Sequence, residues 1–147
     1  MKLIGRAGFL VLLLSSVSYA GAENDRDKLN GSWVQQGEAE NSWTLNADGD
    51  NMHVTQTDGG KKIADFKCDT RGAGCDVKIS GKKAMVSMWF NGSKLTQMET
   101  SGSEVIERSF TILAQGDVME VEIIPIVPGG KKETFRYKRT TLSAQEK

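Results

Sequence analysis

The stretch Leu29-Asn30-Gly31-Ser32-Trp33 opens the folded part of the chain. Gly31 permits a sharp entry into a strand, and Trp33 offers a large apolar surface for the chain to close over. Near the other end, the stretch Phe135-Arg136-Tyr137-Lys138-Arg139 has the pattern of an aromatic and basic strand. We expect these two stretches to be the first and last strands of a small β-barrel, lying side by side.

Turn signals recur along the chain between these two strands, and no helical stretch separates them. Turn signals at such regular spacing indicate an antiparallel meander of hairpins. The turn signals are Asp48-Gly49, Asp58-Gly59-Gly60, Ser80-Gly81, Asn91-Gly92, Ser101-Gly102, Gln115-Gly116 and Pro128-Gly129-Gly130.

The segments between the turns alternate apolar and polar side chains. In the segment 84–90, for example, Ala84, Val86, Met88 and Phe90 share one face. Such alternation is typical of strands with one buried and one wet face. The expected strands are Ser32–Gln36, Ser42–Ala47, Asn51–Thr57, Ile63–Cys68, Asp76–Ile79, Ala84–Phe90, Lys94–Thr100, Val105–Leu113, Val118–Ile126 and Thr134–Lys138.

These strands predict an all-β domain over residues 29–140, followed by a polar tail, 141–147. One-sided strands assemble into a sandwich or a barrel. Hairpin-only connections favour the barrel, because Greek-key sandwiches need longer crossovers, and closure also removes exposed sheet edges. We therefore expect an antiparallel meander closed into a small barrel of about 8–10 strands.

The first residues have the three-part pattern of a secretory signal peptide. A basic start at Lys2 and Arg6 precedes an apolar run, 7–17, and small residues lead up to Ala20. The run is too short to span about 30 Å of hydrocarbon as an uncleaved helical anchor. We expect cleavage after Ala20, with Ala22 as the alternative, and a flexible arm over residues 21–28.

This leader predicts a periplasmic or secreted protein with no membrane span in its mature form. No cysteine lies near either cleavage site, so the pattern of a bacterial lipoprotein is missing. Without Lys2 and Arg6, 17 of the 19 Lys and Arg residues remain against 19 Asp and Glu, a net charge of about −2. That balance argues against nucleic-acid binding, which needs a clustered basic excess.

Two cysteines, Cys68 and Cys75, are predicted to form a disulfide, because exported proteins oxidise paired thiols. Six residues separate them, including two glycines that help the loop to fold back. The spacing does not suit a zinc pair, and the single histidine, His53, is not placed to help. We expect no metal and no cofactor.

The opening Gly31-Ser32-Trp33, the meander and the basic last strand resemble the lipocalin pattern. In that family an arginine of the last strand packs across the strand-one tryptophan, which implies that Arg136 or Arg139 covers Trp33. The whole mature chain resembles small bacterial secreted proteins described as lipocalin-like, which end in a similar Tyr-Lys-Arg. The lipocalin C-terminal helix has no counterpart here. Fatty-acid-binding proteins fit in size and strand count, but 37–41 leaves no room for their helical lid.

Arg108 is the most informative candidate for a ligand site. It shares a strand face with Ile106, Phe110 and Ile112, so an inward orientation would bring a permanent charge among apolar side chains. Such a charge needs a partner. The alternatives are a ligand carboxylate, an internal carboxylate such as Asp65, or the opposite phase with Arg108 in water. The other candidate pocket residues are Met88, Phe90, Phe110 and Met119, which would equally serve as core.

The first functional hypothesis is a binding protein for a small apolar or acidic ligand, with no catalytic residues. The alternative is a protein-interaction module with a solid core, acting through the loop 69–74 between the cysteines, which a disulfide would pre-order. An isomerase or hydrolase remains a third hypothesis. The serines lie in turns outside a Gly-x-Ser-x-Gly elbow, and His53 has no nucleophile nearby in the sequence.

Overall fold

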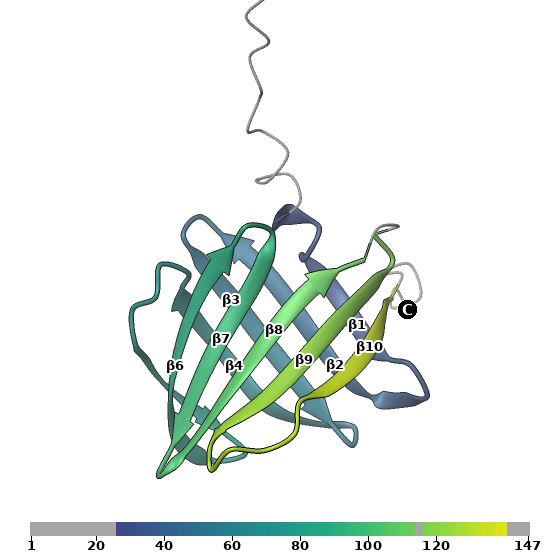
Figure 1. Cartoon of the computed structure of the whole chain (residues 1–147). Helices are drawn as coiled ribbons and strands as arrows, with labels where there is room; N and C mark the ends of the chain where they lie inside the picture. Colours follow the sequence, from purple (N-terminus) through teal and green to yellow (C-terminus); the bar gives the residue numbers. More distant parts are fainter. Residues whose placement is uncertain (1–25, 114–115, 141–147) are drawn as a thin grey trace, which may run out of the picture.

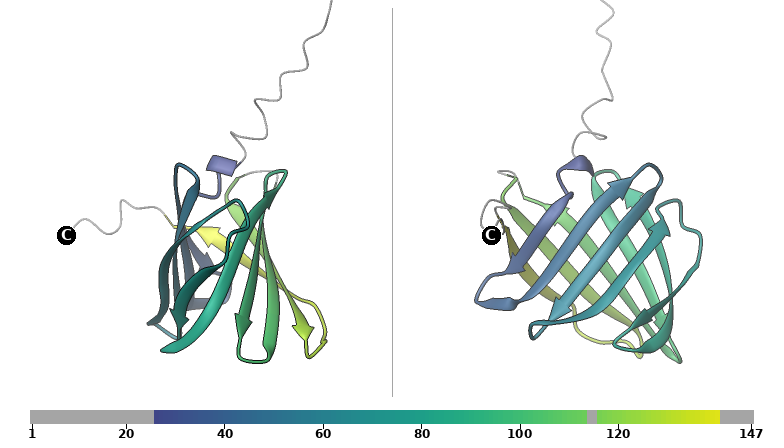
Figure 2. Two further views of the ribbon diagram at one scale, coloured as in Figure 1. Left: turned by 90° about the vertical axis from the view of Figure 1, so that its left-hand side faces the viewer. Right: turned by 180° about the vertical axis from the view of Figure 1, so that it is seen from behind.

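A computed structural model describes residues 26–113 and 116–140. Ten antiparallel strands form a closed barrel in which each strand pairs with the next and β1 pairs with β10. In Figure 1, β6 to β10 lie in front of β1 to β4, and Figure 2 shows the barrel from the side and from behind. The strands are β1 (Gly31–Gln35), β2 (Glu38–Asp48), β3 (Asn51–Asp58), β4 (Lys61–Asp69), β5 (Cys75–Ile79), β6 (Lys82–Asn91), β7 (Lys94–Ser101), β8 (Glu104–Ile112), β9 (Val118–Val127) and β10 (Glu133–Arg139).

The predicted all-β meander closed into a barrel is confirmed, and so is its single disulfide. The main difference is β2, which begins at Glu38 rather than Ser42. Gly37 has φ +86°, a left-handed conformation that lets β1 turn into β2 within two residues and leaves 38–41 free to extend the strand. The predicted signal peptide 1–20, most of the arm 21–28 and the tail 141–147 lie outside the described residues.

The first and last strands meet as expected, with Trp33 paired in register with Arg139. Trp33 is fully buried, and its indole N–H donates to the carbonyl of Leu29 at 3.0 Å. The guanidinium carbon of Arg139 lies 4.2 Å from the centroid of the Trp33 ring. Of the two arginines that the resemblance left open, Arg139 therefore covers Trp33. Arg136 instead lies 3.6 Å from Glu120, with an exposed side chain.

Arg139 also ties together three separate parts of the barrel end. Its two terminal nitrogens donate to the carbonyls of Asn30 at 2.7 Å, Lys28 at 2.6 Å and Gly116 at 3.3 Å. Gly31 makes room for this arrangement, because a Cβ there would lie 2.7 Å from Nη1 of Arg139. Gly31 also has φ +134°, which L side chains rarely adopt.

Backbone pairing between neighbouring strands of the barrel is sparsest between β4 and β5. Their ladder has one registered pair, Ala64 with Ile79, whereas every other neighbouring pair of strands has at least three. Cys68 on β4 and Cys75 on β5 form a disulfide with their Cα atoms 5.9 Å apart. The disulfide thus joins the two strands where backbone pairing does not.

The core fills the end of the barrel around Trp33. Apolar side chains of all ten strands face the interior of the barrel, as the alternation along each strand requires. The fully buried side chains of this core are Leu29, Trp33, Leu45, Met52, Val54, Val86, Met88, Leu95, Phe110, Met119 and Val121. No helix in 26–113 or 116–140 has the length and hydropathy needed to cross a membrane.

Candidate ligand-binding site

A cavity of about 530 Å³ lies inside the other end of the barrel. This end of the barrel carries the β1–β2 and β3–β4 turns. Trp33 lies toward the opposite end, which carries the β8–β9 turn, where Arg139 contacts Gly116. Its aromatic and aliphatic lining residues are Trp43, Ile123, Phe135 and Tyr137, and the other nine lining residues are polar, charged or glycine. Its volume is within the usual range for small-molecule sites in proteins.

The deepest charged group of the cavity wall is Arg108, which points inward. Its Nη1 donates to the carboxylate of Glu99, and both side chains are largely buried, with 12% and 9% of their surfaces exposed. The guanidinium carbon also lies 5.9 Å from the ring centroid of Trp43. Glu99 faces Ile106 across the β7–β8 ladder and is therefore the diagonal neighbour of Arg108.

The internal carboxylate named as an example from the sequence, Asp65, is not the partner of Arg108. Asp65 lies on the outer surface, 2.6 Å from Nε2 of His53 and 3.1 Å from Nζ of Lys62. These hydrogen bonds, the one from His53 first, lower the pKa of Asp65. The reason is parity, because Ala64 and Phe66 face the core and their neighbour Asp65 must face water.

Two further polar side chains face the interior beside this ion pair. Gln97 stands directly across the ladder from Arg108 and is only 1% exposed. Within 26–113 and 116–140, neither atom of its amide group has a hydrogen-bond partner, and neither does Nε of Arg108. Tyr137 is also buried. Its burial raises the pKa of the hydroxyl, while the indole of Trp43 and the charge of Arg108 act in the opposite direction.

The apolar residues proposed from the sequence have a different place from Arg108. Met88, Phe110 and Met119 are fully buried in the packed core and do not line the cavity. Phe110 supports the site indirectly, because its ring packs edge-on against Trp43 with centroids 5.1 Å apart. Phe90 lies under Arg26, whose guanidinium carbon is 4.6 Å from the ring centroid. As ligand contacts, these four residues remain predictions.

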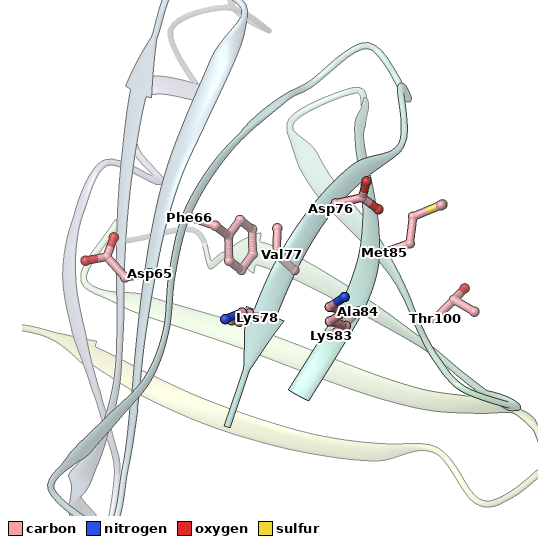
Figure 3. A pocket seen from close by; sticks show the side chains of 9 residues that line it. All are labelled: Asp65, Phe66, Asp76, Val77, Lys78, Lys83, Ala84, Met85 and Thr100. Atoms are coloured by element: carbon pink, nitrogen blue, oxygen red, sulfur yellow. The ribbon is translucent and has the colours of Figure 1, made fainter. Parts of the chain in front are cut away.

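A larger hollow, of about 730 Å³, lies along the sparsely paired part of the wall between β4 and β5. Figure 3 shows its nine side chains, with Asp65 and Phe66 of β4 pointing to opposite sides. Most of the others are exposed polar or charged groups, and Met85 is exposed as well. Its apolar lining residues are Phe66, Val77, Ala84 and Met85.

The loop 69–74 between the cysteines is held against the barrel by its own contacts. The side chain of Arg71 donates to Asp69 at 2.5 Å, and the backbone of Gly72 donates to the carbonyl of Met88 at 2.8 Å. A role for this loop in binding a protein partner remains a prediction. In the described part of the chain, no three metal-ligating side chains cluster together.

The comparisons with known proteins concern the fold. No family model matches the sequence, and no curated protein matches it either. Many solved structures do match this barrel. The fold is that of the fatty-acid-binding and lipocalin-like barrels.

Three of these solved structures cover nearly the whole described barrel. A secretory abundant heat soluble protein from Ramazzottius varieornatus has a TM-score of 0.65 at 14% identity, over 78% of this chain and 96% of its own. The fatty acid transporter REP1-NXSQ has a TM-score of 0.64 at 17% identity, over 78% and 97%. A Schistosoma mansoni fatty acid binding protein in complex with arachidonic acid has a TM-score of 0.62 at 17% identity, over 80% and 99%.

Sequence reasoning found Arg108 but missed Gln97, Glu99 and Tyr137. A signal was present, because Gln97 and Glu99 alternate with Leu95 and so interrupt an apolar face with two polar side chains. Tyr137 similarly alternates with Phe135. Polar residues on the inward phase of a strand were therefore the feature to follow.

Proposed function

We propose that this protein binds a small, mostly apolar molecule inside the barrel and is not an enzyme. The observation that carries this proposal is the cavity of about 530 Å³, in which four aromatic or aliphatic side chains and the largely buried Arg108 lie inside a rim of polar residues. Support comes from similar barrels, since the printed descriptions of two of them name a fatty acid transporter and a fatty acid binding protein.

The proposal is tested by filling the cavity from its wall. Ile123→Trp adds bulk to the cavity lining, whereas Ile126→Trp adds the same bulk at an exposed position of the same strand. We expect a fluorescent acyl probe to bind the unchanged protein and Ile126→Trp alike, and to bind Ile123→Trp at least about tenfold more weakly. Equal binding by all three proteins, or no binding by any, would contradict the proposal.

We also propose that the protein works in the periplasm or outside the cell. This rests on the leader pattern of residues 1–20 alone. The mass of the exported chain checks it, because cleavage after Ala20 would leave Gly21 as the first residue. A cell-associated chain that keeps Met1 would contradict it.

A further inference from the structure

The charge of Arg108 is already neutralised inside the protein. Its partner Glu99 belongs to the neighbouring strand β7 and is as buried as Arg108 itself. An acidic ligand would have to compete with this carboxylate, and the two negative groups would repel each other in a medium of low dielectric constant. The one cation of the cavity wall is therefore not available as a free carboxylate receptor.

The entrance adds to this bias. Glu38, Glu40 and Asp58 also line the cavity, near the β1–β2 and β3–β4 turns, and Arg108 is the only Lys or Arg residue among the described residues of its wall. The cavity and its entrance thus hold three exposed carboxylates in addition to the paired Glu99, against one guanidinium. Like-charge approach of an anionic head group is disfavoured along the whole path.

An uncharged polar group also lines the cavity. The Tyr137 hydroxyl lies close enough to Arg108 for that charge to act on its pKa, which burial raises, so it stays protonated at neutral pH and can donate or accept. Among the residues described, the unpartnered amide of Gln97 stands across the ladder from Arg108 but is not part of the cavity lining. A hydroxyl of this kind is satisfied by a ligand group that itself both donates and accepts.

We propose that the cavity selects an amphiphile with an uncharged polar head, such as a primary amide or an alcohol, over a fatty acid. The head lies beside Arg108 and Tyr137, and the apolar chain extends along Trp43, Ile123 and Phe135. A cationic head is disfavoured in this position because Glu99 is already bonded to Arg108, so no buried carboxylate of the described cavity is left to pair with a second cation. This inference rests on the proposed function, because it names the class of ligand for the same cavity.

The first test compares decanamide, decanoate and decylamine, three compounds with similar chains and different head charges. Calorimetry on the full protein at neutral pH is expected to show decanamide binding at least about tenfold more tightly than either charged compound. Tightest binding by decanoate or by decylamine would overturn the inference while leaving the proposed function in place. Binding of none of the three compounds would remove both.

The second test uses the ion pair. Glu99→Gln releases the guanidinium of Arg108, so decanoate affinity is expected to rise about tenfold or more, while Glu104→Gln, at an exposed position of the same hairpin, changes nothing. If the single variant does not fold, the double variant Glu99→Gln/Arg108→Gln is used, since it leaves no unpaired charge. It is expected to keep the preference for decanamide. The inference would be overturned if the unchanged protein preferred decanoate and the double variant, which lacks Arg108, no longer bound it.

Discussion

Arg139 is the residue on which the closed end of the barrel depends most. Its planar guanidinium stacks on Trp33 and donates to three backbone carbonyls from different segments. A lysine at this position keeps the charge but cannot present forked donors in one plane. The contribution therefore comes from geometry, and it should be lost on a substitution that conserves charge.

We expect Arg139→Lys to lower the free energy of unfolding by about 1–3 kcal/mol, since three backbone carbonyls lose their donors. Arg136→Lys is the matched control, because Arg136 lies on the same strand with an exposed side chain beside Glu120. Its effect should stay within about 0.5 kcal/mol. Urea unfolding measures both, and equal effects of the two substitutions would contradict this role of Arg139.

Tyr137 gives the site a dependence on alkaline pH. Burial raises its pKa in the folded state above that in the unfolded chain. Its contribution to stability is therefore complete below the unfolded pKa of about 10 and is lost as pH rises through the folded pKa. The chain has two tyrosines, and Tyr19 lies in the predicted signal peptide, so the chain that begins at Gly21 has Tyr137 as its only phenol.

In the chain that begins at Gly21, we expect tyrosinate absorbance to titrate above the pKa of a model tyrosine while the protein stays folded. Tyr137→Phe should flatten the loss of stability between that model value and the folded pKa, because the proton release is removed. An absorbance titration at or below the pKa of free tyrosine would show that the hydroxyl is not buried as described.

At the scale of elements, the strand pair β4–β5 depends on a covalent bond. One registered backbone pair and the Cys68–Cys75 disulfide hold the two strands together. We expect Cys68→Ala/Cys75→Ala to lower the free energy of unfolding by about 2–3 kcal/mol in the chain-entropy account. Backbone amides of β5 should exchange with solvent faster, while those of β8 and β9, paired at eight positions, should not change. Unchanged exchange in β5 would contradict this role.

Alternation and turn spacing were sufficient to predict ten strands and their order of pairing, because both depend on neighbours in sequence. The partner of Arg108 was not predictable in this way. Glu99 contacts it through the diagonal of the β7–β8 register, which the turn around Gly102 sets and which a single slip would change. Asp65 failed as a partner for a local reason, since its strand parity directs it outward.

For the whole molecule, the sequence resemblance anticipated the barrel and its tryptophan closure but not the division of its interior. Trp33 and the packed core close one end, and the cavity lies at the other, so stability and binding depend on different residues. How far the core extends depends on side-chain volumes summed over all strands, which no local pattern reports. The alternation pattern of Met88 and Phe110 is therefore the same whether they line a pocket or fill the core.

We expect the ligand to lie inside the cavity end of the barrel, opposite Trp33. Solution NMR with decanamide bound tests it most directly, through contacts between protons of the decyl chain and assigned side chains. We expect contacts from the decyl chain to Ile123, Phe135 and Trp43, which line the cavity. Contacts confined to Met85 and Ile126, which are exposed on the outer surface, or no contacts to the three cavity residues, would contradict it.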